Sequence, residues 1–198
     1  MTSVDFWYDF ASTYSYPSAM RIEKLAAERD LEVVWRPFLL GPVFAELGWR
    51  NSPFNLFPVK GRYMWRDLER VCARHHLPFQ PPDPFPQNSL LAIRTALALD
   101  DARRPEFSRA VFEAEFAHGL AIAERATLAD ILTQMDLHAS AVLEEAALPA
   151  VKQKLKTHSD AAKRLGIFGA PMLVTDEGEL FWGHDRLEEG LDWAVGRR

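Results

Sequence analysis

The sequence predicts an α/β fold: a small mixed β-sheet covered by helices and interrupted by an all-helical insertion. Three observations support this prediction. A strand–helix–strand pattern opens the chain at residues 4–38, a β-hairpin and a helix close it at residues 172–195, and helical spacing dominates the residues between them. We therefore expect one discontinuous sheet-containing domain, residues 1–40 and 150–198, and a helical insertion domain, residues 41–149.

The opening pattern is typical of a parallel strand–helix–strand unit. Apolar and polar side chains alternate through residues 4–10, the period of two expected of a strand. Helical spacing follows over residues 15–29, with Pro17 in the first turn, where its missing N–H costs nothing. Residues 31–38 return to strand composition, and the length of the connection suits a right-handed crossover.

The middle of the chain is expected to be almost entirely helical. Apolar spacing predicts helices at 60–75, 89–100, 106–116 and 139–147, and a capping box of Thr127 and Asp130 predicts another helix before the last of these. The prolines of residues 78–86 require an extended crossing, because proline disrupts helix interiors.

The last third returns to mixed structure. A helix that begins near Val151 is expected to end at Gly166, a residue type typical of helix C-termini. Residues 172–175 and 179–182 are predicted to form two strands joined by an Asp-Glu-Gly turn. Residues 186–195 are predicted to form the closing helix.

Composition argues against several classes of partner. The net charge of the 198-residue chain is −5, and we find no basic stripe for nucleic acid or an anionic membrane. No stretch approaches the roughly 20 apolar residues that a membrane span needs, and the N-terminus lacks the basic segment of a signal peptide. A single cysteine, Cys72, permits no internal disulfide, which favours a cytoplasmic location. The histidines are scattered, so no metal site is expected.

The stretch D-F-A-S-T-Y-S-Y, residues 9–16, contains the first candidate for chemistry. Ser12 lies where the predicted strand ends and the helix begins, near unpaired backbone N–H groups and the positive end of the helix dipole. Such a position stabilises anions, including thiolates. Serine is also among the commonest helix N-caps, and the spacing alone favours a capping role for Ser12 or Ser15.

Two more motifs lie near the C-terminus. In I-F-G-A-P-M-L-V, residues 167–174, a cis Ala170–Pro171 peptide would turn the Ala170 backbone outward, although a trans proline that opens an edge strand is the commoner arrangement. In W-G-H-D-R-L, residues 182–187, Asp185 either caps the last helix or holds a ligand ammonium beside backbone N–H groups. Taken in isolation, the motif favours the capping role.

In order along the chain, these motifs and N-S-P-F-N-L-F-P-V-K-G-R-Y of residues 51–63 resemble the 2-hydroxychromene-2-carboxylate isomerases and their relatives, the kappa-class glutathione transferases. The resemblance covers essentially the whole chain. It implies a thioredoxin-like fold of the glutaredoxin/DsbA type, glutathione as cofactor, and a homodimer. It also implies that Ser12 is the catalytic residue, whose hydroxyl donates a hydrogen bond to the glutathione sulfur and favours the thiolate.

The same resemblance assigns the remaining site residues. Ala170 would pair with the cysteinyl part of glutathione, and His184 and Asp185 would hold its γ-glutamyl end. The expected cofactor-binding residues are Ser12, Tyr14, Asn51, Ala170, Pro171, His184 and Asp185. Further candidates, for the substrate, are Lys60, Asn88 and His118. On their own, Lys60 is typical of a solvated charge, Asn88 of a turn and His118 of a helix surface.

Some residues depart from the family pattern. Thr13 takes the place of the proline in S-P-Y-S, His118 and Ala121 occupy the positions of an E-G-x-D-I motif, and His184 replaces an asparagine or serine. These changes lie near the expected substrate pocket and the glutathione end. They therefore bear on the identity of the substrate more than on the fold.

Three functions fit this pattern. The first is a glutathione-dependent isomerase whose thiolate adds reversibly to an unsaturated, aromatic-derived carboxylate. The second is a kappa-class-like transferase or peroxidase, which shares with the isomerase the initial attack by the glutathione thiolate. The third is a non-catalytic thioredoxin-like protein that binds peptides, because Ser12 and Ser15 replace the cysteines of redox relatives.

Overall fold

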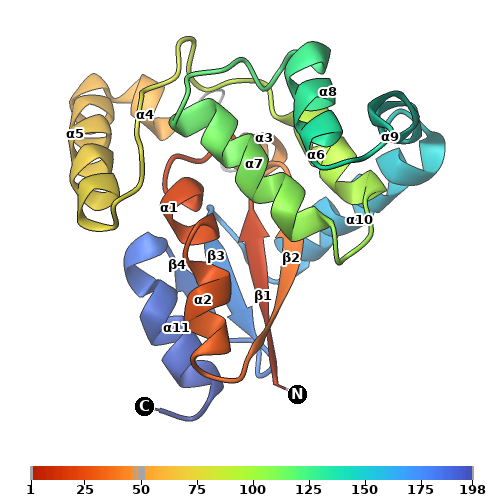
Figure 1. Cartoon of the computed structure of the whole chain (residues 1–198). Helices are drawn as coiled ribbons and strands as arrows, with labels where there is room; N and C mark the ends of the chain where they lie inside the picture. The colour runs from red at the N-terminus through yellow and green to blue at the C-terminus, as the bar shows by residue number, and fades with distance from the viewer. Residues whose placement is uncertain (1, 47, 49–51, 198) are drawn as a thin grey trace.

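The computed structural model describes residues 2–46, 48 and 52–197, and a mixed β-sheet lies at its centre (Figure 1). Within these residues the strand order is β2-β1-β3-β4. Strand β1 pairs in parallel with β2 and antiparallel with β3, which in turn pairs antiparallel with β4. The strands are β1 Ser3–Tyr8, β2 Glu32–Pro37, β3 Met172–Thr175 and β4 Leu180–Trp182. The predicted parallel pair and C-terminal hairpin are confirmed.

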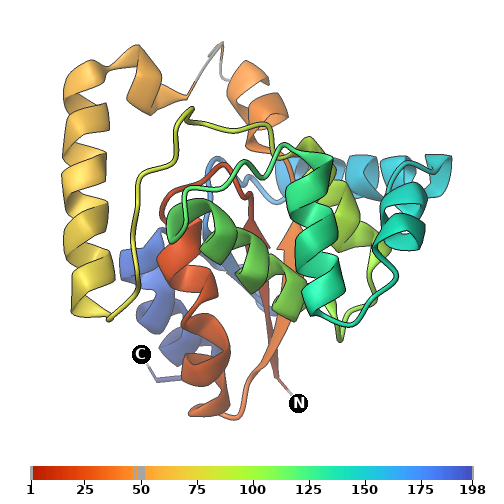
Figure 2. The same cartoon turned by 45° about the horizontal axis from the view of Figure 1, so that its top comes forward.

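Helices cover both faces of this sheet. In Figure 1, α1, α2, α7 and α11 lie in front of the strands, whereas α3 and α10 lie behind them. Figure 2 shows α5 at one side of the molecule and α9 at the other. The helices of the described chain are α1 Ser15–Ala19, α2 Ile22–Ala27, α3 Leu40–Glu46, α4 Pro53–Leu56, α5 Pro58–Arg74, α6 Leu90–Ala98, α7 Arg104–Phe116, α8 Arg125–Gln134, α9 Ala139–Glu145, α10 Pro149–Arg164, the 3-10 helix η1 His184–Arg186 and α11 Leu187–Ala194.

Two predicted helices differ from the structure. The helix expected over residues 15–29 is broken between Ala19 and Ile22 into α1 and α2. The Ser18 hydroxyl donates a hydrogen bond to the Tyr14 carbonyl oxygen at 3.1 Å, a contact that often bends helices. The capping box at Thr127 is wrong, because α8 begins at Arg125 and Thr127 lies inside its first turn.

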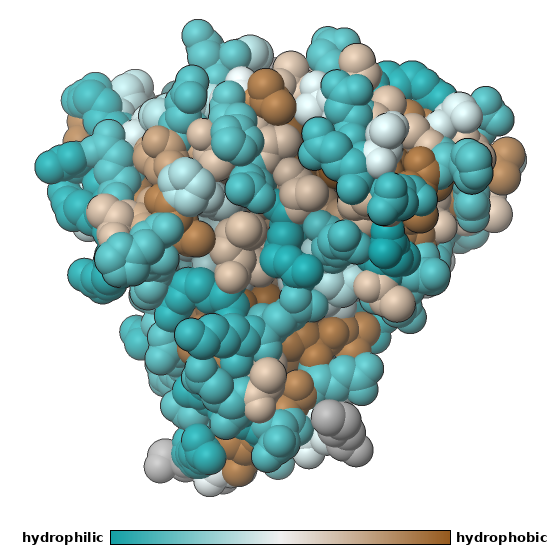
Figure 3. Space-filling model, viewed as in Figure 1, coloured by the Kyte–Doolittle hydropathy of each residue, from teal (hydrophilic) through white to brown (hydrophobic). Residues whose placement is uncertain are grey.

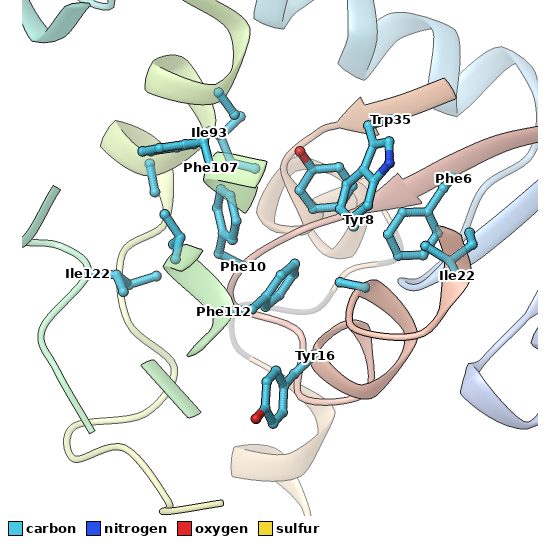
Figure 4. Packing of buried hydrophobic residues seen from close by; sticks show 14 of the residues in the cluster. Phe6, Tyr8, Phe10, Tyr16, Ile22, Trp35, Ile93, Phe107, Phe112 and Ile122 are labelled. Carbon is cyan, nitrogen blue, oxygen red and sulfur yellow. The ribbon is translucent and has the colours of Figure 1, made fainter. Parts of the chain in front are cut away.

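The larger core lies on the face of the sheet that α1, α2 and α7 cover, and its aromatic centre appears in Figure 4. The Phe6 and Tyr8 rings of β1 meet Trp35 of β2 edge to face, with ring centroids 5.1 and 5.3 Å apart. From α7, Phe112 approaches Tyr8 of β1 with a centroid separation of 5.8 Å, and Phe10, just after that strand, with one of 4.9 Å. A helix of the predicted insertion therefore packs directly on the first strand, and the domain boundaries at residues 40 and 150 stay a prediction.

A smaller core fills the opposite face of the sheet. Trp7 of β1 and Met172 of β3 point to this side, where they pack with Val43 of α3 and Ala162 of α10. Side chains alternate between the two faces along β1, since consecutive residues of a strand point in opposite directions. This second layer fixes the start of α3 next to the end of β1.

The outer surface is mostly polar. Figure 3 shows hydrophilic residues over most of this view, with hydrophobic residues in separate smaller patches. Within the part of the chain that the structure describes, no helix combines the length and apolar character of a membrane span. Cys72 lies in the core, 1% exposed, and burial raises its pKa to about 12. Cys72 is therefore a buried residue of the core.

Candidate functional site

The loop between β1 and α1 places Ser12 against the segment that precedes β3. Ser12 is 6% exposed, and its hydroxyl donates a hydrogen bond to the carbonyl oxygen of Ala170 at 2.8 Å. Its backbone N–H donates to the Asp9 carbonyl oxygen at 3.0 Å. Two segments that lie far apart in the sequence therefore meet through this serine side chain.

Neither serine caps the first helix. The N-cap of α1 is Tyr14, whose side chain makes no capping hydrogen bond. The Ser15 hydroxyl is fully buried and has no hydrogen-bond partner among the described residues. The capping role that the spacing alone favoured for Ser12 or Ser15 is wrong, because the loop turns Ser12 toward Ala170 and α1 begins three residues later.

The Ala170–Pro171 peptide is cis, so the trans arrangement favoured by base rates is wrong for this bond. Pro171 precedes β3, which lies between β1 and β4 and is not an edge strand. The Pro171 carbonyl oxygen accepts a hydrogen bond from the Gly183 N–H at 3.0 Å. Ala170 is half-buried, and its carbonyl oxygen faces the Ser12 hydroxyl.

Tyr14 connects the first helix with α5 and η1. Its hydroxyl donates a hydrogen bond to Asp67 of α5 at 2.9 Å, and its ring stacks on His184 with 5.0 Å between centroids and 7° between planes. Burial, followed by the Asp67 carboxylate, raises the pKa of Tyr14. Burial lowers the pKa of His184, although the carboxylates of Asp185 and Asp67 oppose that shift. A neutral imidazole therefore lies flat against a neutral phenol.

Asp185 is exposed on η1, and the N-cap of the last helix, α11, is Arg186. The preceding Gly183 has a φ of 103°, and a Cβ at that position would lie 2.5 Å from the Asp185 Oδ1 atom. A side chain at residue 183 would therefore displace the Asp185 carboxylate. The favoured capping role is wrong for the described chain, and the carboxylate remains accessible at this end of the site.

The substrate candidates are dispersed. Lys60 is exposed on α5, with its ammonium 5.1 Å from the Phe57 ring centroid. The exposed Asn88 accepts a hydrogen bond from the Leu90 N–H at 3.0 Å, as a turn residue does. His118 is exposed in a groove of about 450 Å³ between α7 and α8, and Ser12 does not line this groove. Asn51 lies outside the described residues.

Two site residues were missed by the sequence interpretation. Asp67 is one of many charged residues of α5, and Asp9 belongs to a predicted strand of alternating polarity. The buried Asp9 carboxylate accepts hydrogen bonds from the Ala11 N–H at 3.0 Å and the Leu40 N–H at 2.7 Å. An acidic residue directly before the S-x-x-S segment was the available signal for Asp9. Asp67 had no such signal, because only the fold brings it to Tyr14.

The described residues contain no group of histidine, cysteine, aspartate and glutamate side chains that could hold a metal ion. The site consists instead of a hydroxyl donor, a half-buried peptide backbone and an exposed carboxylate, contributed by Ser12, Ala170 and Asp185. Such a set suits a short peptide that carries an ammonium group and a thiol, because each group has a complementary partner. The donor set therefore fits glutathione.

Comparison with known proteins agrees with this description. The family model of the DSBA-like thioredoxin domain matches residues 3–192. The chain is 28% identical to the 2-hydroxychromene-2-carboxylate isomerase of Sphingobium xenophagum over 94% of both proteins. It is 29% identical to glutathione S-transferase kappa 1 of Homo sapiens, over 94% of this chain and 88% of that protein. A solved structure of a 2-hydroxychromene-2-carboxylate isomerase superposes with a TM-score of 0.89 at 26% identity, over 98% of this chain and 95% of that chain.

Proposed function

The chain belongs to the DsbA-like thioredoxin family, and on that premise we propose that it is a glutathione-dependent isomerase of the 2-hydroxychromene-2-carboxylate type. Its substrate is an unsaturated, aromatic-derived carboxylate. When bound near Ser12 and Asp185, glutathione would supply a nucleophilic thiolate that is regenerated in each turnover, so none would be consumed. The relatives named above include both isomerases and a kappa-class transferase, which supports an enzyme of this kind.

The hydrogen bond between the Ser12 hydroxyl and the Ala170 carbonyl oxygen is the observation that carries the proposal. This bond places the Ser12 hydroxyl at the cis-proline segment and directs its hydrogen to the Ala170 carbonyl oxygen, which supports a donor role for Ser12. When an extended peptide occupies the Ala170 backbone, the Ser12 hydroxyl can rotate and donate to the sulfur. A charge-assisted hydrogen bond favours thiolate over thiol, because it stabilises the charged form alone.

The remaining residues bind and orient the cofactor. Asp185 is exposed at η1, where its carboxylate can pair with the α-ammonium of the γ-glutamyl group. Tyr14 and Asp67 tie α5 to this end of the site and so hold His184 in place. This arrangement restricts the position of the thiolate, and positioning contributes to rate by lowering the entropy lost on reaching the transition state.

Net thiol consumption tests the assignment. An isomerase brings the chromene carboxylate to equilibrium with its isomer while the concentration of glutathione stays constant. Stoichiometric loss of free thiol during turnover would instead favour a kappa-class-like transferase. This is the second candidate, because the chain is 29% identical to the human kappa enzyme. If calorimetry detects no glutathione binding, both the isomerase and the transferase hypotheses are excluded, and a non-catalytic peptide-binding protein becomes the favoured function.

A further inference from the structure

Trp182 of β4 is a large apolar side chain that belongs to neither core and that the proposed reaction does not use. It lies on the edge strand of the sheet (Figure 1) and is 54% exposed. The Phe168 ring, 46% exposed, meets the indole edge to face with 5.1 Å between centroids. Two aromatic rings therefore lie together at the surface, beside the segment that leads into the cis Ala170–Pro171 peptide.

The indole lies directly against the backbone of Gly169. A Cβ atom at residue 169 would be 2.5 Å from the indole nitrogen and 3.1 Å from the adjacent Cε2 atom, closer than non-bonded heavy atoms pack. The φ of Gly169 is not left-handed, so the approach of the indole, and not the backbone conformation, excludes a side chain here. Gly169 is buried although both aromatic neighbours are exposed, and the Trp182 indole forms part of its cover.

Hydrogen bonds fix the two ends of this segment but not its middle. The Ile167 N–H donates to the Ala162 carbonyl oxygen at 2.9 Å, and the Ala170 carbonyl oxygen accepts from the Ser12 hydroxyl. Between these ends, the backbone N–H and C=O groups of residues 168–169 have no hydrogen-bond partner among the described residues. Their position therefore depends on side-chain packing, and the contact with the indole supplies it.

The same stretch of β4 also holds the chain after the cis bond. Gly183, the residue after Trp182, donates its N–H to the Pro171 carbonyl oxygen at 3.0 Å. Two consecutive residues therefore contact the chain on either side of Ala170, whose carbonyl oxygen faces the Ser12 hydroxyl. Displacement of the indole would move the Ala170 backbone relative to Ser12, because packed groups shift together.

We propose that Trp182 is a positioning residue for the backbone along which glutathione would bind. Its indole holds Gly169, and through it the Ala170 backbone, in a fixed place relative to Ser12. The Phe168 ring packs on the indole from the same segment, so the contact is made on both residues that precede Ala170. The effect on glutathione rests on the proposed function, whereas the contact itself is a property of the folded chain alone.

Amide hydrogen exchange at Gly183 tests the contact without any ligand. Gly169→Ala forces the indole away, so the bond from the Gly183 N–H to Pro171 should open more often and its exchange should accelerate about fivefold. In a Trp182→Ala background the new methyl group meets no indole, and the rate should stay within about twofold of that background. An unchanged rate in Gly169→Ala alone, or equal acceleration in both backgrounds, would overturn the proposal. Trp182→Val serves as the background should Trp182→Ala not fold, and Gly41→Ala, where a Cβ would meet no atom within 4 Å, is the control.

Calorimetry with S-methylglutathione tests the positioning role. We expect the dissociation constant to increase about fivefold in Gly169→Ala and in Trp182→Ala, and the double variant to bind no more weakly than Trp182→Ala. Leu148→Ala, which removes a side chain of 52% exposure at the start of α10, should bind as the parent does. Unchanged affinity in both single variants, or losses that multiply in the double variant, would refute the role. If the parent does not bind this probe, the proposed function and the positioning role both fail, while amide exchange still decides whether the indole holds Gly169.

The pKa of the bound glutathione thiol is a readout that reduced stability alone would not change. Misplacement of the Ala170 backbone relative to Ser12 should raise this pKa in Trp182→Ala, and Trp182→Phe, which keeps an aromatic ring at this position, should restore part of it. An unchanged thiol pKa in Trp182→Ala, together with a raised one in Ser12→Ala, would refute the positioning role and leave the assignment of Ser12 standing.

Discussion

Replacing Ser12 by alanine removes the hydroxyl that joins the first loop to Ala170. A hydrogen bond to a charged group is worth about 1.5–3 kcal/mol, and one pKa unit corresponds to about 1.36 kcal/mol. The pKa of the bound glutathione thiol should therefore increase by about one to two units in Ser12→Ala. At neutral pH the thiolate population, and with it kcat/KM for isomerisation, should decrease by up to about a hundredfold, and by less the more fully the thiol is ionised in the parent.

The assay is a titration of thiolate ultraviolet absorbance with bound glutathione, followed by isomerisation kinetics at the same pH values. Ser15→Ala is the matched control, because its hydroxyl is buried without a partner among the described residues and should leave the thiol pKa unchanged. The lost neutral bond to Ala170 should lower the stability of Ser12→Ala by only about 1 kcal/mol. A thiol pKa in Ser12→Ala equal to that of the parent would refute the role assigned to Ser12.

Three further outcomes follow from other parts of the structure. Tyr14→Phe keeps the ring that stacks on His184 but loses the bond to Asp67, so calorimetry should show severalfold weaker glutathione binding; unchanged affinity would remove Asp67 from the site. Burial lowers the pKa of His158 to about 4, so the folded chain binds fewer protons than the unfolded chain between pH 6.5 and 4. The free energy of unfolding should therefore fall as pH decreases through this window in the parent, and fall less in His158→Gln. Denaturant titrations at several pH values can measure it, and an equal pH dependence in both proteins would contradict this cause. Cys72, with a pKa of about 12, should resist alkylation at pH 8 in the folded protein and react in denaturant, which mass spectrometry can show.

The sequence was informative where a local pattern has one geometric outcome. Alternating residues of β1 must face opposite sides of a sheet, and the closing hairpin follows from two short strands and an Asp-Glu-Gly turn. The end of α10 was equally predictable from the sequence, because Gly166 follows the helix with a φ of 75°, a conformation that favours glycine. Local patterns were misleading at Thr127, where tertiary packing extends α8 beyond the apparent cap.

The candidate site depended on contacts between distant residues. Ser12 and Ala170 were both singled out from their own motifs, yet only the folded chain shows that they share a hydrogen bond. Asp67 could not be distinguished from the other charges of α5 until the fold brought it to Tyr14. Asn88 and His118 lie at a turn and in a separate groove, because register along the chain does not fix which side of a helix or loop faces the site.

By itself, the sequence determined the order of the four strands, the presence of a single cysteine, and the serines at positions 12 and 15. These are local properties, fixed by periodicity and side-chain chemistry. Tertiary structure alone decided that the Ser12 hydroxyl faces Ala170 and does not cap α1, and that the Glu115 carboxyl group is buried. The reason is physical: hydrogen-bond partners and desolvation depend on which distant surfaces meet, and that information is spread over the whole chain.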